Sequence, residues 1–309
     1  MKELLRGTIA YRSFAEGKDV SHATLIVFPD EAYLRVLLKE CAKAFFCAAD
    51  GTRVAELVEK ETYSDCLILP ASGEKWAVDL GVKIIDESLL RPVECAKKLF
   101  VLDAFHTASA LVQNKLLKVL EEPPAGVYFL LGATAEYSVL PTVLSRMKKI
   151  IVPPFSEESV KSALMRITGG ASGIGEAAAA CGGVLSAAQA LLAGGGEDFR
   201  LAEKFFLGEN IAASRAAGER KEKKSFLSAL KLVLRDALFF QTGQEEYAAR
   251  RSDGIGKIAR EYPASALLKG MELAVWAEKQ INLNAPLAQC LETLFIGMEE
   301  EKKKWQRLS

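Results

Sequence analysis

At 309 residues the chain is too long for one ordinary hydrophobic core, so its length predicts two or three domains. Half of the residues are hydrophobic and 26% are charged, which is typical of a soluble globular protein. The 40 basic residues balance the 40 acidic ones, and this balance argues against capture of nucleic acid by overall charge.

Short apolar runs alternate with helical patterns in the first half of the chain. Residues 23–28 predict a buried strand, and residues 32–46 repeat apolar side chains at helical spacing. Another helix is predicted between 102 and 127, with Thr107 as its cap, Leu111 on its apolar face and two prolines at its end. Three further runs predict strands: 66–69, 99–102 and 127–131. This alternation indicates a mostly parallel sheet covered on both faces.

After residue 153 the pattern becomes helical. Residues 156–193 predict small alanine-rich helices, and Gly194–Gly196 a hinge. From about 198 onward the chain predicts longer helices, one of which has an apolar face formed by Phe226, Leu230, Val233, Leu234 and Ala237. The predicted layout is an α/β domain (1–153), a small helical domain (154–197) and an all-α domain (198–309).

Cysteine usage and the chain's first residues exclude several classes of protein. The six cysteines form no CxxC pair and only two histidines are present, so we expect reduced thiols, no metal site and no cofactor. No apolar run reaches the roughly 18 residues of a membrane span. The first residues, MKELLRGTIAYRSF, lack the apolar core of a secretory signal. We therefore expect a cytoplasmic protein with no membrane partner.

The stretch KLFVLDAFHTASALVQNKLLKVLEEPP contains part of an ATP-hydrolysing site. Its apolar run ends at Asp103, as a strand does when it supplies a carboxylate to nucleotide-bound magnesium. Ala104 follows, where such sites often have a glutamate that activates water.

Four segments resemble the delta-prime family of bacterial DNA polymerase III clamp-loader subunits, which belong to the AAA+ superfamily. QNKLLKVLEEPP resembles the family's "ALLKTLEEPP" helix, and FLLGATAEYSVLPTVLSRMKKI its sensor-1 strand and serine-arginine-cysteine motif, here with methionine for cysteine. CGGVLSAAQALL resembles the lid segment, and LKLVLRDALFF with INLNAPLAQCLETLF the collar. The resemblance implies a RecA-like AAA+ domain, a helical lid domain and a helical collar domain. The collar domain is expected to pack against other subunits through apolar faces such as that of Phe226, Leu230 and Val233.

The phosphate-binding loop of this family is degenerate here. Counting back without gaps from Cys47, which matches the family's cysteine after the first helix, places FPDEAYLR at the loop. Five positions lack the residues that phosphate and magnesium need: glycine at Phe28, Glu31 and Tyr33, lysine at Leu34, and serine or threonine at Arg35. We expect no ATP binding by this loop.

Other positions of the nucleotide machinery are altered as well. Ala104 replaces the carboxylate that would polarise water, and Ser186 occupies the expected sensor-2 arginine position. Thr134, in the sensor-1 segment, and His106, in a worn Asp-Ala-Phe-His string, are expected to be structural. These changes predict a subunit without its own ATPase activity.

Arg146, with Ser145 in the same motif, is the exception. The resemblance implies that Arg146 acts as an arginine finger on ATP bound by a neighbouring subunit, a role that suits a permanently charged, forked guanidinium. A surface arginine without such a role is the alternative.

Two further segments qualify the resemblance. The family commonly carries a four-cysteine zinc module after the cysteine that matches Cys47, but the segment to Cys66 is too short for it. The string TGGASGIG is like the cofactor loop of short-chain dehydrogenases, yet the residues before it have helical spacing and no tyrosine has a lysine four positions on. We interpret it as a loop of the lid domain.

The resemblance implies a hetero-pentamer with gamma/tau ATPase subunits and a delta subunit, which loads the sliding clamp on primed DNA. Any contact of this chain with clamp or DNA is expected to be indirect. A purely structural AAA+ scaffold subunit remains the main alternative, and a dehydrogenase a remote one.

Overall fold

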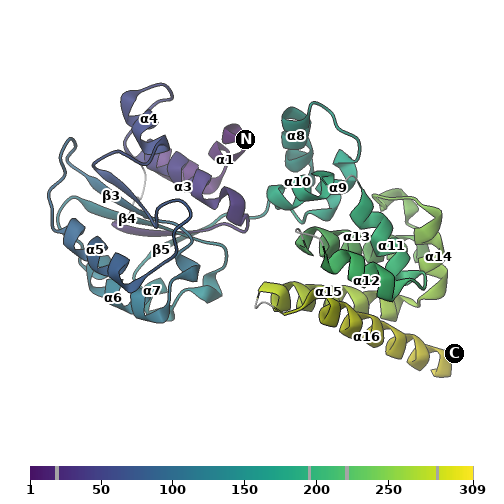
Figure 1. The fold of residues 1–309 in the computed structure, drawn as a ribbon. Coiled ribbons are helices and arrows are strands. Elements are labelled where there is room, and N and C mark those ends of the chain that lie inside the picture. Colours follow the sequence, from purple (N-terminus) through teal and green to yellow (C-terminus); the bar gives the residue numbers. More distant parts are fainter. Residues whose placement is uncertain (18–20, 194–195, 220–222, 283–284, 309) are drawn as a thin grey trace. The chain divides into compact units, whose positions relative to one another are not determined.

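The computed structural model describes residues 1–17, 21–193, 196–219, 223–282 and 285–308. The chain divides into two compact units, Met1–Pro154 and Phe155–Ser309 (Figure 1). The predicted division of the second unit near residue 197 stays a prediction, and Gly194 and Gly195 of the predicted hinge lie outside the described residues.

The first unit is built on a five-stranded sheet in the order β2-β3-β4-β1-β5, with each neighbouring pair parallel. The strands are β1 (Ala23–Val27), β2 (Cys66–Leu69), β3 (Lys98–Leu102), β4 (Val127–Ala133) and β5 (Lys148–Ile151). Every residue of β1 and β3 is buried, as expected for strands covered on both faces. The predicted α/β class with a parallel sheet is confirmed, whereas β5 was not predicted because its sequence, KKII, leaves two of four residues exposed.

Helices cover both faces of the sheet, with α1, α3 and α4 on one and α5, α6 and α7 on the other (Figure 1). The helices of this unit are α1 (Lys2–Arg6), α2 (Ile9–Ala15), α3 (Glu31–Phe45), α4 (Arg53–Glu59), α5 (Val78–Ser88), α6 (Ala110–Glu121) and α7 (Pro141–Leu144). Two 3₁₀ turns accompany them, η1 (Phe105–Thr107) and η2 (Glu136–Ser138).

Helix α6 begins and packs differently from its prediction. Ser109, not Thr107, caps it by accepting a hydrogen bond from the backbone N–H of Val112. Thr107 belongs to η1, where its hydroxyl donates to the carbonyl of Ala104. Leu111 is exposed, whereas Leu116 is fully buried. The buried face of α6 therefore includes Leu116 but not Leu111.

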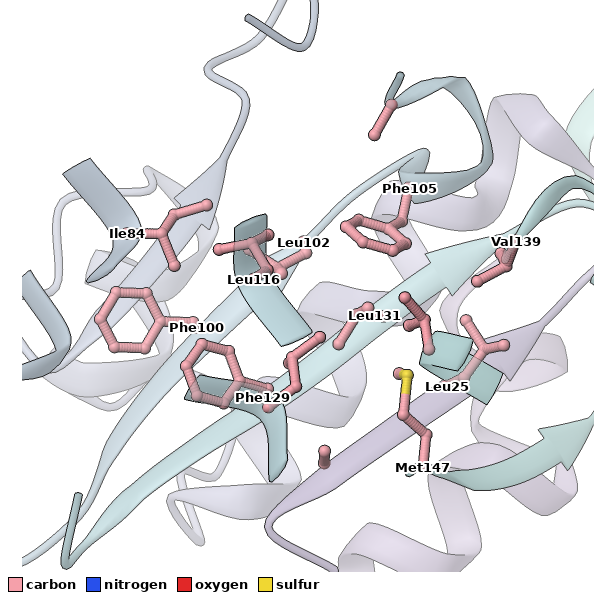
Figure 2. Close-up of a cluster of buried hydrophobic side chains, with 14 of the residues drawn as sticks. Leu25, Ile84, Phe100, Leu102, Phe105, Leu116, Phe129, Leu131, Val139 and Met147 are labelled. Atoms are coloured by element: carbon pink, nitrogen blue, oxygen red, sulfur yellow. The ribbon is translucent and has the colours of Figure 1, made fainter. Parts of the chain in front are cut away.

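The core beneath α5, α6 and α7 joins strands and helices around aromatic rings (Figure 2). Phe100 of β3 and Phe129 of β4 stack with ring centroids 5.1 Å apart. Leu116 of α6 and Met147, just before β5, enter the same cluster. Burial of this apolar surface fixes α6 and the turn before β5 against the sheet.

The second unit is helical, and among its described residues no strand occurs. It contains α8 (Glu157–Thr168), α9 (Ile174–Ala180), α10 (Leu185–Ala193), α11 (Glu197–Phe206), α12 (Asn210–Gly218), α13 (Lys223–Gln241), η3 (Glu245–Tyr247), α14 (Asp253–Glu261), α15 (Ala264–Asn282) and α16 (Leu287–Leu308). The TGGASGIG string spans the end of α8, the turn and the start of α9, and Gly169 ends α8 with φ of 67°. It follows a helix, which contradicts a dinucleotide-binding loop after a strand.

The apolar face of α13 packs within its own chain. Its five predicted residues have no exposed surface: Phe226, Leu230, Val233, Leu234 and Ala237. Helices α11, α14 and α15 pack around α13 and cover this face. The expectation that these side chains contact other subunits is therefore wrong, because they are already used in the unit's own core.

Candidate functional site

The segment FPDEAYLR, at the position of the family's phosphate-binding loop, forms no extended loop. Phe28 continues the sheet by donating its backbone N–H to the carbonyl of Ala133, and α3 already begins at Glu31. Leu34, at the expected lysine position, is fully buried and would lie 3.1 Å from a methyl group built on Gly132 of β4. The chain therefore passes from β1 to α3 through residues 28–30 alone, without the long glycine-rich loop that surrounds phosphate in such sites.

Arg35 occupies the place expected of the magnesium-binding hydroxyl, and its side chain contacts the carboxylate that would face magnesium. Arg35 Nη1 lies 2.9 Å from Asp103 Oδ2. On the other side, Arg35 Nη2 and Nε contact the two carboxylate oxygens of Glu61 at 2.5 and 2.9 Å. A third contact runs from Nη2 to the carbonyl of Pro70 at 3.1 Å. The guanidinium thus links α3 to the ends of β2 and β3.

The charges of this cluster balance. Lys39, one helical turn after Arg35, lies 2.8 Å from Glu61 Oε1, so two cations face the carboxylates of Asp103 and Glu61. The hydrogen bond from Arg35 lowers the pKa of Glu61 to about 2. Burial lowers the pKa of Arg35, but its hydrogen bonds to Glu61 and Asp103 raise it further, so the net shift is upward. Glu61 and Arg35 therefore stay charged at neutral pH.

Asp103 and the residues after it form hydrogen bonds with other segments of the first unit. The carbonyl of Asp103 accepts a hydrogen bond from Trp76 Nε1 at 3.0 Å, and Ala104 adopts a left-handed conformation with φ of 46°. His106 Nδ1 accepts the backbone N–H of Thr134 at 3.4 Å, which requires an unprotonated Nδ1. Burial lowers the pKa of His106, against the opposing charges of Glu31 and Asp103. His106 and Thr134 thus join the ends of β3 and β4.

Arg146 and Ser145 lie in the turn between α7 and β5. Their positions are set by two buried neighbours, Val143 in α7 and Met147, which fills the core where the related motif has cysteine. Gln113 of α6 braces the same element: its amide donates to the carbonyl of Ala108 and accepts the N–H of Leu140, the cap of α7. The turn is therefore held from both sides.

Arg146 and the cluster of Arg35, Asp103 and Glu61 lie at opposite ends of the parallel strands. Arg146 lies two residues before the start of β5, whereas Asp103 directly follows β3. Because the strands are parallel, all of them start on one side of the sheet and end on the other, so the start of β5 and the end of β3 lie on opposite sides. Arg146 is thus placed away from Asp103 of its own chain. Ser186 lies in α10 of the second unit.

Sequence reasoning missed the partners of Arg35. Arg35, Lys39 and Lys43 recur every four residues on α3, and this spacing aligns them on one face of the helix. Lys43 pairs with Glu40 and with Glu59, and Lys39 donates to the carbonyl of Glu59. The basic stripe was visible in the sequence, but most of its acidic partners come from other elements: Glu59 ends α4, Glu61 follows it and Asp103 follows β3.

Ion pairs fix the short segment that stands where the related proteins carry a zinc module. Arg6 of α1 donates to both carboxylate oxygens of Asp50 at 2.7 and 2.6 Å. Together with the pairs at Glu59 and Glu61, this attaches residues 50–61 to α1 and α3. In the described part of the chain no group of three or more His, Cys, Asp or Glu side chains is arranged to hold a metal, and all six cysteines are free thiols.

Comparisons with known proteins find similarity to subunits of DNA polymerase III. The family model described as "DNA polymerase III, delta subunit" matches residues 9–156. The DNA polymerase III subunit gamma/tau of Mycobacterium bovis is 35% identical over 69 residues, 22% of this chain and 12% of that protein. The tau subunit of Bacillus subtilis is 25% identical over 157 residues, 48% of this chain and 28% of that protein.

Among solved structures, a gamma subunit-related protein of Thermotoga maritima matches with a TM-score of 0.47 and 15% identity, covering 95% of this chain and 99% of that one. The chain spans less than a third of the length of the two curated relatives. No helix among the described residues is long and apolar enough to cross a membrane. Over residues 9–156, the chain is therefore similar to the delta subunit of DNA polymerase III.

Proposed function

We propose that the chain is a delta-prime-type clamp-loader subunit that hydrolyses no ATP itself and donates Arg146 to the ATP site of a neighbouring subunit. The observation that carries the first half is the position of Arg35, held between Asp103 and Glu61. The second half rests on the placement of Arg146 near the start of β5, at the end of the parallel strands opposite to Asp103.

Arg35 is a permanent substitute for the metal at this site. A magnesium ion bound to a nucleotide would need the Asp103 carboxylate, which the guanidinium already neutralises at 2.9 Å. Releasing Asp103 would leave a charged pair partly buried, because the side chains of Arg35 and Asp103 are 20% and 15% exposed. The missing phosphate loop and the alanine after Asp103 remove the remaining requirements for hydrolysis.

Arg146 has the properties of a residue that acts on another molecule's phosphate. Its side chain is 34% exposed, and its backbone is fixed by the buried neighbours in the turn. A guanidinium forms paired hydrogen bonds with phosphate oxygens, and arginines supplied in this way accelerate phosphoryl transfer by about 10³–10⁵. In the proposed assembly, the recipients are gamma/tau-type ATPase subunits.

The proposed assembly is a hetero-pentamer with gamma/tau and delta subunits that opens the sliding clamp and leaves it on primed DNA. The chain would act as a rigid member of this ring. Its balanced charge, 40 basic against 40 acidic residues, suits attachment through protein contacts rather than through DNA.

The first test is ATP turnover by the reconstituted loader with clamp and primed DNA. The gamma/tau subunits should carry alanine for their own motif arginines, so that turnover depends on Arg146 alone. We expect Arg146→Ala to lower turnover by at least about a hundredfold at equal assembly. Lys149→Ala is the matched control, because Lys149 is a nearby exposed cation that pairs with Glu136 at 2.5 Å. Unchanged turnover in Arg146→Ala would leave a structural subunit.

The second test concerns nucleotide binding by the chain alone. Titration with a fluorescent ATP analogue and magnesium should give no saturable binding, whereas a gamma/tau subunit serves as the positive control. Magnesium-dependent binding of the analogue by the wild-type chain at micromolar concentration would contradict the proposed blocked site.

A purely structural role is the second candidate, and one contact favours it. Arg146 forms an ion pair with Glu121 of its own chain, as many surface arginines do. The turnover test separates the two functions.

A further inference from the structure

The side chain of Glu121 is the carboxylate that contacts Arg146. Glu121 is the last residue of α6, and its Oε2 accepts a hydrogen bond from Arg146 Nε at 2.9 Å. In the sequence, Glu121 is the first glutamate of the LEEPP string. Because the two residues are 25 positions apart, the contact depends on the packing of α6 against α7 and not on local sequence.

The hydrogen bonds of Arg146 are distributed unevenly over its guanidinium. Nε donates to Glu121, and Nη1 donates to the carbonyl of Thr142 at 2.8 Å and to Ser145 Oγ at 3.3 Å. Within the described residues, Nη2 donates no hydrogen bond. Arginine has five N–H donors in a fixed plane, so fixing Nε and Nη1 also fixes the direction of Nη2. The two N–H groups of Nη2 can therefore bond to an acceptor outside the chain.

The backbones at both ends of this contact are rigid. Leu120, next to Glu121, is fully buried, and Met147, next to Arg146, is 8% exposed. Only the two side chains are therefore free to rearrange. An unrestrained arginine side chain loses conformational freedom when it is fixed. A partner that holds it in place beforehand removes part of this cost from the reaction.

We propose that Glu121 is a positioning residue that orients Arg146 towards the phosphate of the neighbouring subunit's ATP. This inference rests on the proposed function of Arg146. The carboxylate takes the Nε side of the guanidinium and leaves Nη2 for phosphate oxygens. Its own side chain is 52% exposed, so solvent weakens its attraction for the arginine and the pair does not sequester the charge. A phosphate group with several negative charges competes successfully for the remaining donors.

The test uses the loader described above, in which turnover depends on Arg146. Glu121→Ala is expected to lower kcat about three- to tenfold, the effect of losing part of the side chain's fixed orientation, with KM for ATP unchanged. Glu121→Gln keeps an oxygen that accepts from Nε and should restore most of the rate. Glu122→Ala is the matched control, because Glu122 is the adjacent exposed acid and forms no ion pair within the described residues.

A double-mutant cycle separates positioning from a general structural effect. In an Arg146→Ala background, Glu121→Ala should cause no further loss, because its effect acts through the arginine. A full additional loss in that background would overturn the inference, as would unchanged or increased kcat in Glu121→Ala when Arg146→Ala is impaired. If Arg146→Ala itself retains full turnover, the proposed function fails, and the role of Glu121 fails with it.

Discussion

Replacement of Arg35 by methionine is expected to destabilise the first unit because it leaves two carboxylates without their main cation. Removing one partner of a fully buried pair costs about 3–5 kcal/mol. Here Asp103 and Glu61 are 15% and 18% exposed, and Glu61 keeps Lys39 at 2.8 Å. We therefore expect a loss of about 2–3 kcal/mol in the free energy of unfolding at pH 7.

The pH dependence of this loss follows from Glu61. Its pKa in the folded protein is about 2, below the ordinary value of 4.5 for a glutamate, so its stabilising contribution is present above pH 4.5. That contribution declines as the pH falls from 4.5 towards 2. The difference between wild type and Arg35→Met should therefore narrow by about 1 kcal/mol at pH 3.5.

Urea unfolding monitored by Trp76 measures this difference in the relevant unit. Trp76 donates to the carbonyl of Asp103 and thus reports on the cluster, and phenylalanine at positions 276 and 305 removes the other two tryptophans. Arg53→Met is the control: Arg53 pairs with Glu94 but is 70% exposed, so we expect a much smaller change in the unfolding free energy than for Arg35→Met. Equal losses in the two variants, or a loss in Arg35→Met that does not vary with pH, would refute the reasoning.

Three other substitutions test the frame around the site. The buried carboxylate of Asp65 accepts the backbone N–H groups of residues 93–95 at 2.6 to 2.8 Å, so Asp65→Asn should cost about 1–3 kcal/mol and speed amide exchange in that segment; unchanged exchange there would contradict the anchoring role. The pKa of His106 is lowered in the folded protein, so its stabilising contribution is present above pH 6.5 and declines as the pH falls through the lowered value; His106→Gln should lose this decline between pH 7.5 and 5 in urea titrations. A methyl group on Gly132 would lie 2.6 Å from a leucine methyl of α3, so Gly132→Ala should lower the unfolding free energy by about 1–3 kcal/mol, whereas Gly81→Ala, with no contact shorter than 3.6 Å, should change it less.

Continuous apolar runs made most of the sheet predictable. Residues of β1 and β3 are all buried, and such runs are typical of parallel strands covered on both faces. Residue types alone also predict a degenerate phosphate-binding loop, since Leu34 and Arg35 cannot replace lysine and a small hydroxyl at phosphate. By contrast, β5 lies at the sheet edge and has only half of the apolar pattern, so it was not recognised.

Periodicity predicts that a face is buried but not which residues cover it. The apolar face of α13 was therefore assigned to other subunits, whereas helices of the same unit cover it. Likewise, the N-terminal cap of α6 depends on where the preceding 3₁₀ turn ends, which selects Ser109 over Thr107.

The sequence by itself determined the fold class of the first unit, and it predicts a degenerate phosphate-binding loop and an arginine finger in the motif before β5. Only the tertiary structure decided what those residues contact. Arg35 and Asp103 are 68 positions apart, and Arg146 and Glu121 are 25 apart. Ion pairs over such separations require that helices and strands be packed first, because short-range attraction between side chains depends on distances that the fold alone sets.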